Sequence, residues 1–109
     1  MDLVVNRFSI WLIELDPTRG SEISKTRPCL IISPNESNNY LNTVIIVPLT
    51  STIKNYPTRI NIDFQSKKGQ IALDQIRSVD KSRLLKEIGN LNTLLSEKVC
   101  SILNEYFEY

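Results

Sequence analysis

Short runs of apolar, largely β-branched residues, separated by polar turn residues, occupy most of this 109-residue chain up to about residue 76. Such runs are typical of strands, and the polar turns between them favour antiparallel pairing. Residues 43–47 are apolar apart from the first threonine, as in a strand buried on both faces. We therefore predict a small, strongly bent antiparallel sheet or SH3-like barrel. Its expected strands span residues 9–15, 29–33, 43–49, 59–64 and 70–76, with loops over 18–26, 34–42 and 51–58.

The last part of the chain changes to a helical period. Its apolar residues recur at the spacing of one helix face: Leu95, Val99, Ile102, Leu103 and Tyr106. Thr93 is the predicted N-cap of this helix. An amphipathic helix in so small a chain covers the sheet. The sequence thus predicts a mainly β, α+β fold that ends in a helix, in a single domain over residues 1–109.

The composition, 41% hydrophobic and 23% charged, is ordinary for a globular protein and argues against extended disorder. No apolar run approaches the roughly 20 residues that span a bilayer, and the first residues do not resemble a secretory signal. Two cysteines, Cys29 and Cys100, are too few for a disulfide scaffold and sit among apolar neighbours. We expect a cytoplasmic protein with reduced, core-packed thiols and no membrane association.

The chain contains no histidine. This excludes a Ser-His-Asp triad, a Cys-His pair, a His-ligated zinc site and a histidine acid–base pair. No pair of carboxylates has convincing metal-ligand spacing either, so we expect no metal and no other cofactor. Proton transfer by this chain has to use carboxylates, hydroxyls, Arg, Lys or Tyr.

The net charge of +1 conceals a separation of charge along the chain. The stretch from residue 19 to residue 86 holds eleven basic and five acidic residues, which gives +6, so the two ends together carry −5. A basic middle permits a polyanionic partner such as nucleic acid without requiring one.

Arg27 stands at the end of a polar loop, directly before a run that we expect to be buried. A guanidinium in that position needs a partner or a ligand, because burial of an unpaired charge is costly. Its planar fork suits a phosphate, to which it can donate two hydrogen bonds. The alternative is a structural ion pair with a carboxylate such as Glu22 or Asp74.

Two further positions are candidates for the same chemistry. Thr50 and Ser51 follow an apolar strand, where their hydroxyls could donate to a phosphate oxygen or cap the local backbone. Asp74 lies within the apolar run of residues 71–76, where a carboxylate needs a partner. Beside an arginine it could accept a proton, or it could simply form a structural Asp–Arg pair.

Taken together, these motifs resemble the MazF/PemK/Kid family of toxin–antitoxin ribonucleases. The resemblance runs from about residue 8 to the C-terminal helix, and its motifs occur in one order: Ile10-Trp11-Leu12, Leu15-Asp16-Pro17-Thr18, Gly20-Ser21-Glu22, Thr26-Arg27-Pro28, Leu30-Ile31-Ile32-Ser33-Pro34, Val47-Pro48-Leu49-Thr50-Ser51 and Asp74-Gln75-Ile76-Arg77-Ser78-Val79-Asp80.

The resemblance implies a homodimer that cleaves single-stranded RNA, often mRNA, at short sequences without a metal, and that a cognate antitoxin inhibits. It implies catalytic roles for Arg27, Thr50 and either Asp74 or Glu22 as proton acceptor, with Asp74 preferred because we expect it beside Arg27. The expected RNA contacts are Ser21, Lys25, Ser51, Tyr56, Gln75 and Arg77.

The chain departs from the family pattern in three places. Phe8-Ser9 replaces the usual Gly-Asp or Gly-Glu before the first strand, while Ser21 and Ala72 occupy positions where some members carry histidine and arginine. Mechanisms that use those two side chains cannot operate here. The residues present suit attack by the RNA's own 2′-OH, which would leave a 2′,3′-cyclic phosphate, or a 3′-phosphate, and a 5′-OH.

Two alternative functions remain open at this point. One is a CcdB-like toxin of the same fold, which binds DNA gyrase without catalysis. Such proteins use a C-terminal segment with an exposed Trp, whereas this chain ends in residues 105–109, EYFEY. The other is an inactive, RNA-binding relative.

Overall fold

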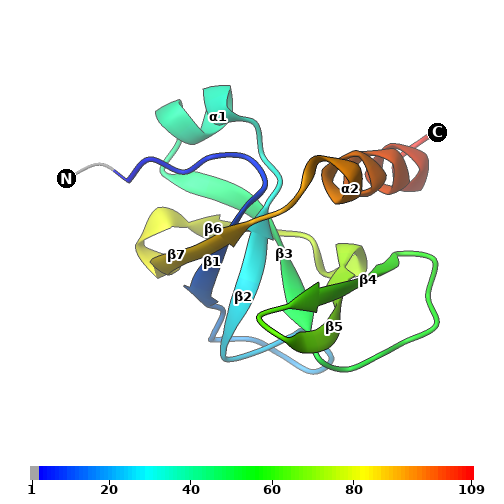
Figure 1. Ribbon diagram of the computed structural model, residues 1–109. Coiled ribbons are helices and arrows are strands. Elements are labelled where there is room, and N and C mark those ends of the chain that lie inside the picture. The colour runs from blue at the N-terminus through cyan, green and yellow to red at the C-terminus, as the bar shows by residue number, and fades with distance from the viewer. Residues whose placement is uncertain (1–2) are drawn as a thin grey trace.

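The computed structural model describes residues 3–109, which form one curled antiparallel sheet covered by a C-terminal helix (Figure 1). The strands are β1 (Ser9–Glu14), β2 (Thr26–Ile31), β3 (Thr43–Thr50), β4 (Arg59–Phe64), β5 (Lys67–Ala72), β6 (Arg77–Asp80) and β7 (Leu84–Asn90). The helices are α1 (Asn35–Tyr40) and α2 (Thr93–Tyr106), and two short 3₁₀ turns are η1 (Leu73–Gln75) and η2 (Lys81–Arg83). The predicted fold class, a mainly β sheet with a terminal helix, is confirmed.

Strand β3 organises the sheet because it pairs with three others. The strand order is β4-β5-β3-β2-β1-β7, and β6 pairs with β3 outside this path. The first half of β3 pairs with β6, from Thr43 opposite Asp80 to Ile46 opposite Arg77. Its end pairs with β5, where Thr50 lies opposite Gln70. The two halves of the bent sheet are therefore joined through β3, which pairs with strands of both.

The sheet curls so that its two outer strands approach each other. Gly89 in β7 lies so close to the Phe64 ring of β4 that a Cβ built on it would be 3.0 Å from that ring. Strands β4 and β7 stand at opposite ends of the strand order. A glycine here lets the partly closed barrel form without displacing the ring.

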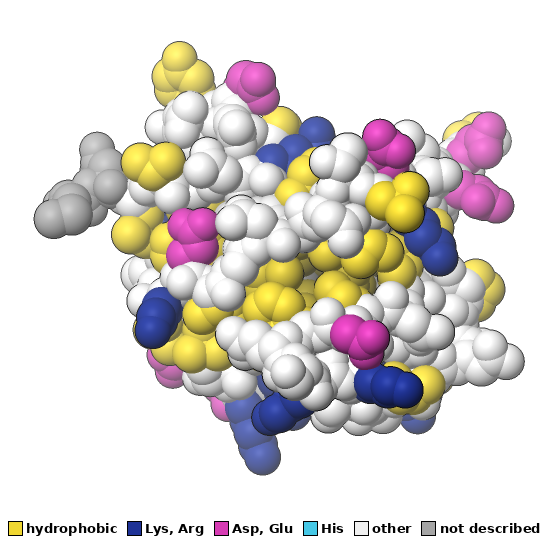
Figure 2. Space-filling view, in the orientation of Figure 1, with side chains coloured by type: hydrophobic (Ala, Val, Ile, Leu, Met, Phe, Trp, Pro, Cys, Tyr) yellow, Lys and Arg dark blue, Asp and Glu magenta, His cyan; other side chains and the backbone are white. Residues whose placement is uncertain are grey.

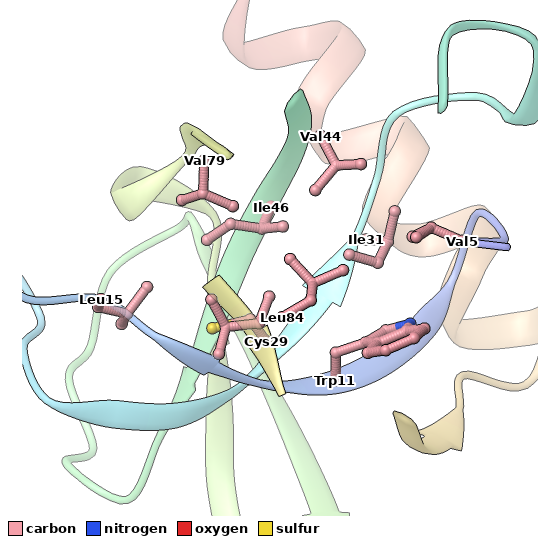
Figure 3. Packing of buried hydrophobic residues seen from close by; sticks show 10 residues of the cluster. Val5, Trp11, Leu15, Cys29, Ile31, Val44, Ile46, Val79 and Leu84 are labelled. Atoms are coloured by element: carbon pink, nitrogen blue, oxygen red, sulfur yellow. The ribbon is translucent and has the colours of Figure 1, made fainter. Parts of the chain in front are cut away.

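Both faces of the central strands are buried, in two separate clusters. Cys29 and Ile31 of β2 belong to the first cluster, shown in Figure 3, whereas Leu30 belongs to the second, which also receives Val99 of α2. Successive residues of a strand point to opposite faces, and β3 is buried on both faces only from Ile46 onward. In its first half Thr43 and Ile45 are exposed, so the expectation that residues 43–47 are buried on both faces is wrong for that half. Figure 2 shows hydrophobic side chains across the middle of one face, between α2 and the β4–β5 hairpin, with Lys and Arg side chains along the lower edge.

The structure corrects several local predictions. The strand expected over residues 70–76 ends at Ala72, and β5 begins at Lys67, where we expected a turn. The turn is at Gln65 and Ser66, whose positive φ angles of 51° and 63° suit a two-residue hairpin loop. β2 begins at Thr26, three residues earlier than expected.

Other elements were not predicted at all. α1 lies within the expected loop over residues 34–42, and β6 and β7 lie where no strand was expected. The predicted C-terminal helix is confirmed, but its N-cap is Asn92, whose side chain accepts a hydrogen bond from the backbone N–H of Leu95 at 2.8 Å. Neither helix of residues 3–109 is long and apolar enough to cross a membrane.

Candidate functional site

Arg27 and Thr50 are brought together by the pairing of β2 with β3. The paired register runs from Ile31 opposite Ile46 to Cys29 opposite Pro48, and Arg27 and Thr50 each lie two residues beyond this last pair. Both side chains line one depression, together with Ser51. Leu49, Ile62 and Phe64 contribute apolar walls, and the β5 residues Lys67 and Lys68 add positive charge. The depression therefore combines cations, hydroxyls and an apolar surface.

The Arg27 guanidinium carries a charge that no described carboxylate neutralises. Its Nε donates to the carbonyl oxygen of Ser24 at 3.0 Å, which fixes the side chain against the preceding loop. Among residues 3–109, no carboxylate lies within ion-pairing distance of it. Glu22 Oε1 instead accepts a hydrogen bond from the backbone N–H of Arg19 at 2.6 Å. The ion-pair alternative for Arg27 is thus not found, and the site keeps its positive charge.

The Thr50 hydroxyl is oriented by the local backbone. Its Oγ1 accepts a hydrogen bond from the N–H of Thr52 at 3.1 Å, so the capping alternative is found. That bond uses an oxygen lone pair, and the hydroxyl proton can still be donated to an anion. Gly69 allows β5 to pack close to the Thr50 backbone, since a Cβ at this position would lie 2.6 Å from the Thr50 carbonyl oxygen.

The other acidic and polar candidates lie in a second depression. It is lined by residues from the first loop, the 3₁₀ turn η1 and the start of β6: Ser21, Glu22, Ile23, Asp74, Gln75, Ile76 and Arg77. Gln75 joins two of these segments, because its Oε1 accepts from the N–H of Ile23 at 3.2 Å and its Nε2 donates to the carbonyl of Ser21 at 3.3 Å. Arg77 donates to the carbonyl of Leu15 at 3.2 Å.

Asp74 is paired with Arg59 and not with Arg27. Arg59 donates from Nε to Oδ1 at 2.7 Å and from Nη2 to Oδ2 at 3.1 Å, and the Thr58 hydroxyl adds a third hydrogen bond at 3.0 Å. The hydrogen bonds from Arg59 lower the pKa of Asp74, although partial burial opposes them. Our expectation that Asp74 stands beside Arg27 is therefore replaced by the structural Asp–Arg pair, with a partner that we had not foreseen.

Cys29 is confirmed as a core residue. It is fully buried, and burial raises the pKa of its thiol to about 12, against the opposing charges of Arg77 and Arg27. A thiol with that pKa supplies almost no thiolate at neutral pH, which excludes it as a nucleophile.

The loop between β3 and β4 is held by residues that sequence reasoning missed. Gln70, which is buried, pairs through its amide with the backbone N–H and carbonyl of Lys54, each at 3.0 Å. Arg59 carries the Asp74 pair and lies over the ring of Tyr56. The available signal was the alternation of residues 59–64, which sets Arg59 on the face opposite to Ile60. The expected contacts Lys25, Ser51 and Tyr56 are all exposed.

Comparisons with known proteins identify the family. A family described as "PemK-like, MazF-like toxin of type II toxin-antitoxin system" matches residues 6–107. The chain belongs to this family. It is 32% identical over 103 residues to "Endoribonuclease EndoA" of Bacillus subtilis, covering 89% of either chain. It is 34% identical over 107 residues to "Endoribonuclease MazF" of Staphylococcus saprophyticus, covering 93% of this chain and 86% of the relative.

Solved structures of MazF-type toxins share the fold. MazF from Deinococcus radiodurans superposes with a TM-score of 0.86 at 24% identity and covers 99% of this chain and 100% of its own. A mycobacterial endoribonuclease, solved in complex with its cognate antitoxin, gives a TM-score of 0.78 at 22% identity over 93% of this chain and 92% of its own. The resemblance inferred from the motifs is thereby confirmed.

The Asp74–Arg59 pair predicts how stability depends on pH. A carboxyl whose pKa is lowered in the folded state stabilises that state above its unfolded pKa, and this contribution is lost as the pH falls through the folded pKa. At neutral pH, Asp74→Asn should lower the free energy of unfolding by about 1.5–3 kcal/mol, as for a hydrogen bond to a charged group. The difference from the unsubstituted protein should disappear as the pH falls below the ordinary value of 3.8. Urea unfolding from neutral to acidic pH measures both effects.

Asp80→Asn is the matched control. Asp80 accepts a hydrogen bond from the N–H of Ser82 at 2.9 Å at the start of η2, a capping role that asparagine also fills. This variant should change stability far less than Asp74→Asn. Equal stability of Asp74→Asn and the unsubstituted protein at neutral pH would contradict the account of the pair.

Proposed function

We propose that this MazF-type toxin is an endoribonuclease that cleaves single-stranded RNA, such as mRNA, at a short recognition sequence. The observation that carries the proposal is the guanidinium of Arg27, which has no carboxylate partner among the described residues and faces Thr50 across two paired strands. A fixed cation beside a hydroxyl suits one phosphodiester of a polyanion. The relatives named endoribonucleases support the same activity.

The RNA supplies its own nucleophile. The 2′-OH loses its proton to an acceptor and attacks the adjacent phosphorus, and the bond from phosphorus to the 5′-oxygen breaks. The 5′-oxygen takes a proton from water, and the products are a 2′,3′-cyclic phosphate and a 5′-OH. Arg27 would bind the scissile phosphate through its planar fork and stabilise the negative charge that develops on the oxygens. Thr50 would donate its proton to one of these oxygens, with Ser51 beside it. No step requires a metal-bound water, so we propose a reaction without metal or other cofactor.

Glu22 is our proposed acceptor for the 2′-OH proton. The carboxylate of Asp74 receives three hydrogen bonds and its pKa is lowered, which makes it a weak base. Glu22 is exposed, and its loop is tied to Arg27 through the carbonyl of Ser24. Asp74 remains the alternative acceptor, and the kcat and pH–rate profile of Asp74→Asn test that role.

The remaining RNA contacts are proposed around the two depressions. Lys25 and Arg77 supply positive charge, and Ser21 and Gln75 supply polar groups on the first loop and η1. Tyr56 offers an exposed ring for a nucleobase. We propose that these side chains contact the nucleotides next to the phosphate that Arg27 binds. Contacts to phosphates position the RNA, and contacts to bases give sequence specificity.

We further propose a homodimer, a cognate antitoxin as inhibitory partner, and a cytoplasmic location. The family is defined by type II toxin–antitoxin systems, and structures of related toxins include complexes with their antitoxins. Exposed apolar side chains such as Leu85 and Phe107 leave surface available for protein contacts.

Arg27→Ala should abolish cleavage and leave the fold intact, because the variant loses a half-buried cation and no part of either core cluster. Arg27→Lys should restore little activity, since a point charge cannot reproduce the two-pronged contact. Gel analysis of a long single-stranded RNA, with melting temperature as the check on folding, measures this. Near-native activity of Arg27→Ala would place the site elsewhere. A CcdB-like toxin, by contrast, would cleave no RNA in either form.

Replacement of the scissile ribose by deoxyribose should stop cleavage at that bond, because it removes the nucleophile, while RNA binding persists. EDTA should leave the rate unchanged, and the 3′ fragment should carry a 5′-OH. Analysis of the fragment ends by mass spectrometry tests this. A reaction that tolerates deoxyribose, stops in EDTA and leaves a 5′-phosphate would show that a metal-bound water is the nucleophile.

A further inference from the structure

Three side chains form a continuous row that starts at Asp74, on the wall of the second depression. The Arg59 guanidinium lies over the ring of Tyr56, 5.1 Å from its centroid, and its nitrogens bind both oxygens of Asp74. The Arg59 side chain is only 6% exposed, against 24% for Asp74. The Tyr56 residue is 49% exposed. The row therefore has a buried cation at its centre and ends in a ring that faces solvent.

The loop that carries Tyr56 is anchored on both sides of it. Before the ring, Lys54 is held through its backbone by Gln70. After it, the Thr58 hydroxyl donates to Asp74 and the Thr58 carbonyl accepts from the N–H of Leu73 at 3.0 Å. These contacts fix the loop to β5 and to η1. The ring is consequently held in place by its neighbours and does not depend on a ligand for its position.

A half-exposed aromatic ring with a cation on one face suits one kind of ligand. Stacking on a planar base is worth about 1–3 kcal/mol and tolerates any base. The Arg59 guanidinium holds the ring by a cation–π contact on one face, which leaves the other face for a base. The ring also lies on the loop that starts at Ser51, directly after Thr50. Ser51 lines the Arg27 depression, and so does Gln70, which binds the backbone of Lys54 two residues before the ring. The loop therefore leads from that depression to the ring.

We propose that Asp74 and Arg59 are positioning residues that hold the Tyr56 ring as a stacking platform for one nucleobase flanking the cleaved phosphodiester. The carboxylate fixes the guanidinium, the guanidinium covers one face of the ring, and the base stacks on the other. This inference rests on the proposed RNA cleavage and gives Asp74 a role in substrate placement instead of proton transfer. Tyr56 touches the substrate directly, and the other two act through it.

An abasic scan tests the platform. A single-site RNA substrate is prepared with an abasic nucleotide at each flanking position in turn, and kcat and KM are measured separately. In the unsubstituted protein, removal of the base at one flanking position should lower kcat/KM by about 5- to 150-fold, the range expected for the loss of one stacked base. Tyr56→Ala should remove that sensitivity, because the base then has nothing to stack on, whereas Tyr56→Phe should keep it.

The positioning residues are tested on the same substrates. Arg59→Gln should remove most of the sensitivity to the abasic position, mainly through KM, and should leave kcat on the abasic RNA unchanged. Asp74→Asn should remove the same sensitivity through KM. Asp80→Asn, the same chemical change at the η2 cap, should retain the full sensitivity. Tyr56 is exposed and outside both core clusters, so its variants should fold normally. They therefore test the stacking platform even if Asp74→Asn is destabilised.

Three results would overturn the inference. An unchanged abasic profile in Tyr56→Ala would show that no base stacks there. An Asp74→Asn protein with reduced kcat on intact and abasic RNA alike, together with a shifted pH–rate profile, would make Asp74 the proton acceptor. RNA with deoxyribose at the scissile position is not cleaved, so its Kd measures binding alone. If removal of the flanking base left this Kd unchanged, the stacking platform would be excluded independently of catalysis. Failure of the proposed function is separate, since it appears as no cleavage of intact RNA at any position.

Discussion

The antiparallel pairing of β2 with β3 is the constraint on which the candidate site depends. The pairing of Cys29 with Pro48 sets the register, and two residues further along each strand it brings Arg27 to Thr50. A slip of one residue would turn every side chain of β2 to the opposite face, and both faces are buried here. The two hydrophobic clusters therefore hold the register, and the register holds the site. Gly69 has no side chain, so β5 can pair with the end of β3 without displacing Thr50.

Charge at the site is controlled by where the carboxylates are used. Asp74 is occupied by Arg59, and Glu22 accepts from the backbone of its own loop, so neither neutralises Arg27. The positive field in the depression follows from this distribution and not from the net charge of the chain, which is only +1. An arginine held by a single backbone carbonyl can turn its remaining donors toward a phosphate. This is the electrostatic basis of the proposed activity.

Patterns that depend on local periodicity could be read from the sequence. The stripe from Leu95 to Tyr106 predicted α2, and the apolar run of residues 43–47 predicted the strand β3. The burial of that run on both faces was wrong for its first half, because Ile45 is exposed. The position of Arg27 before a buried run also predicted a charge in need of a ligand. The apolar continuity of residues 70–76 was misleading, because the backbone turns into η1 after Ala72 although the side chains remain apolar. β7, with a mixed surface pattern over LLKEIGN, offered no periodic signal.

Partners across space could not be read in the same way. The Asp74–Arg59 contact joins residues fifteen apart through the β4–β5 hairpin, whose register depends on where the two-residue turn falls. Because the turn was expected at residues 67–69, the hairpin pairing could not be derived, and Asp74 was assigned to the wrong arginine. The role of Gln70 could not be predicted either, because its side chain makes hydrogen bonds with the backbone N–H and carbonyl of Lys54, which lies in another segment.

The central claim is that Arg27 and Thr50 hold the scissile phosphate. A crystal structure of the protein bound to RNA with deoxyribose at the scissile position tests it most directly. The account predicts that the phosphate 3′ to that deoxyribose lies between the Arg27 guanidinium and the Thr50 hydroxyl, within hydrogen-bond distance of both. A complex in which that phosphate contacts neither side chain, with the RNA bound over another face of the sheet, would contradict it.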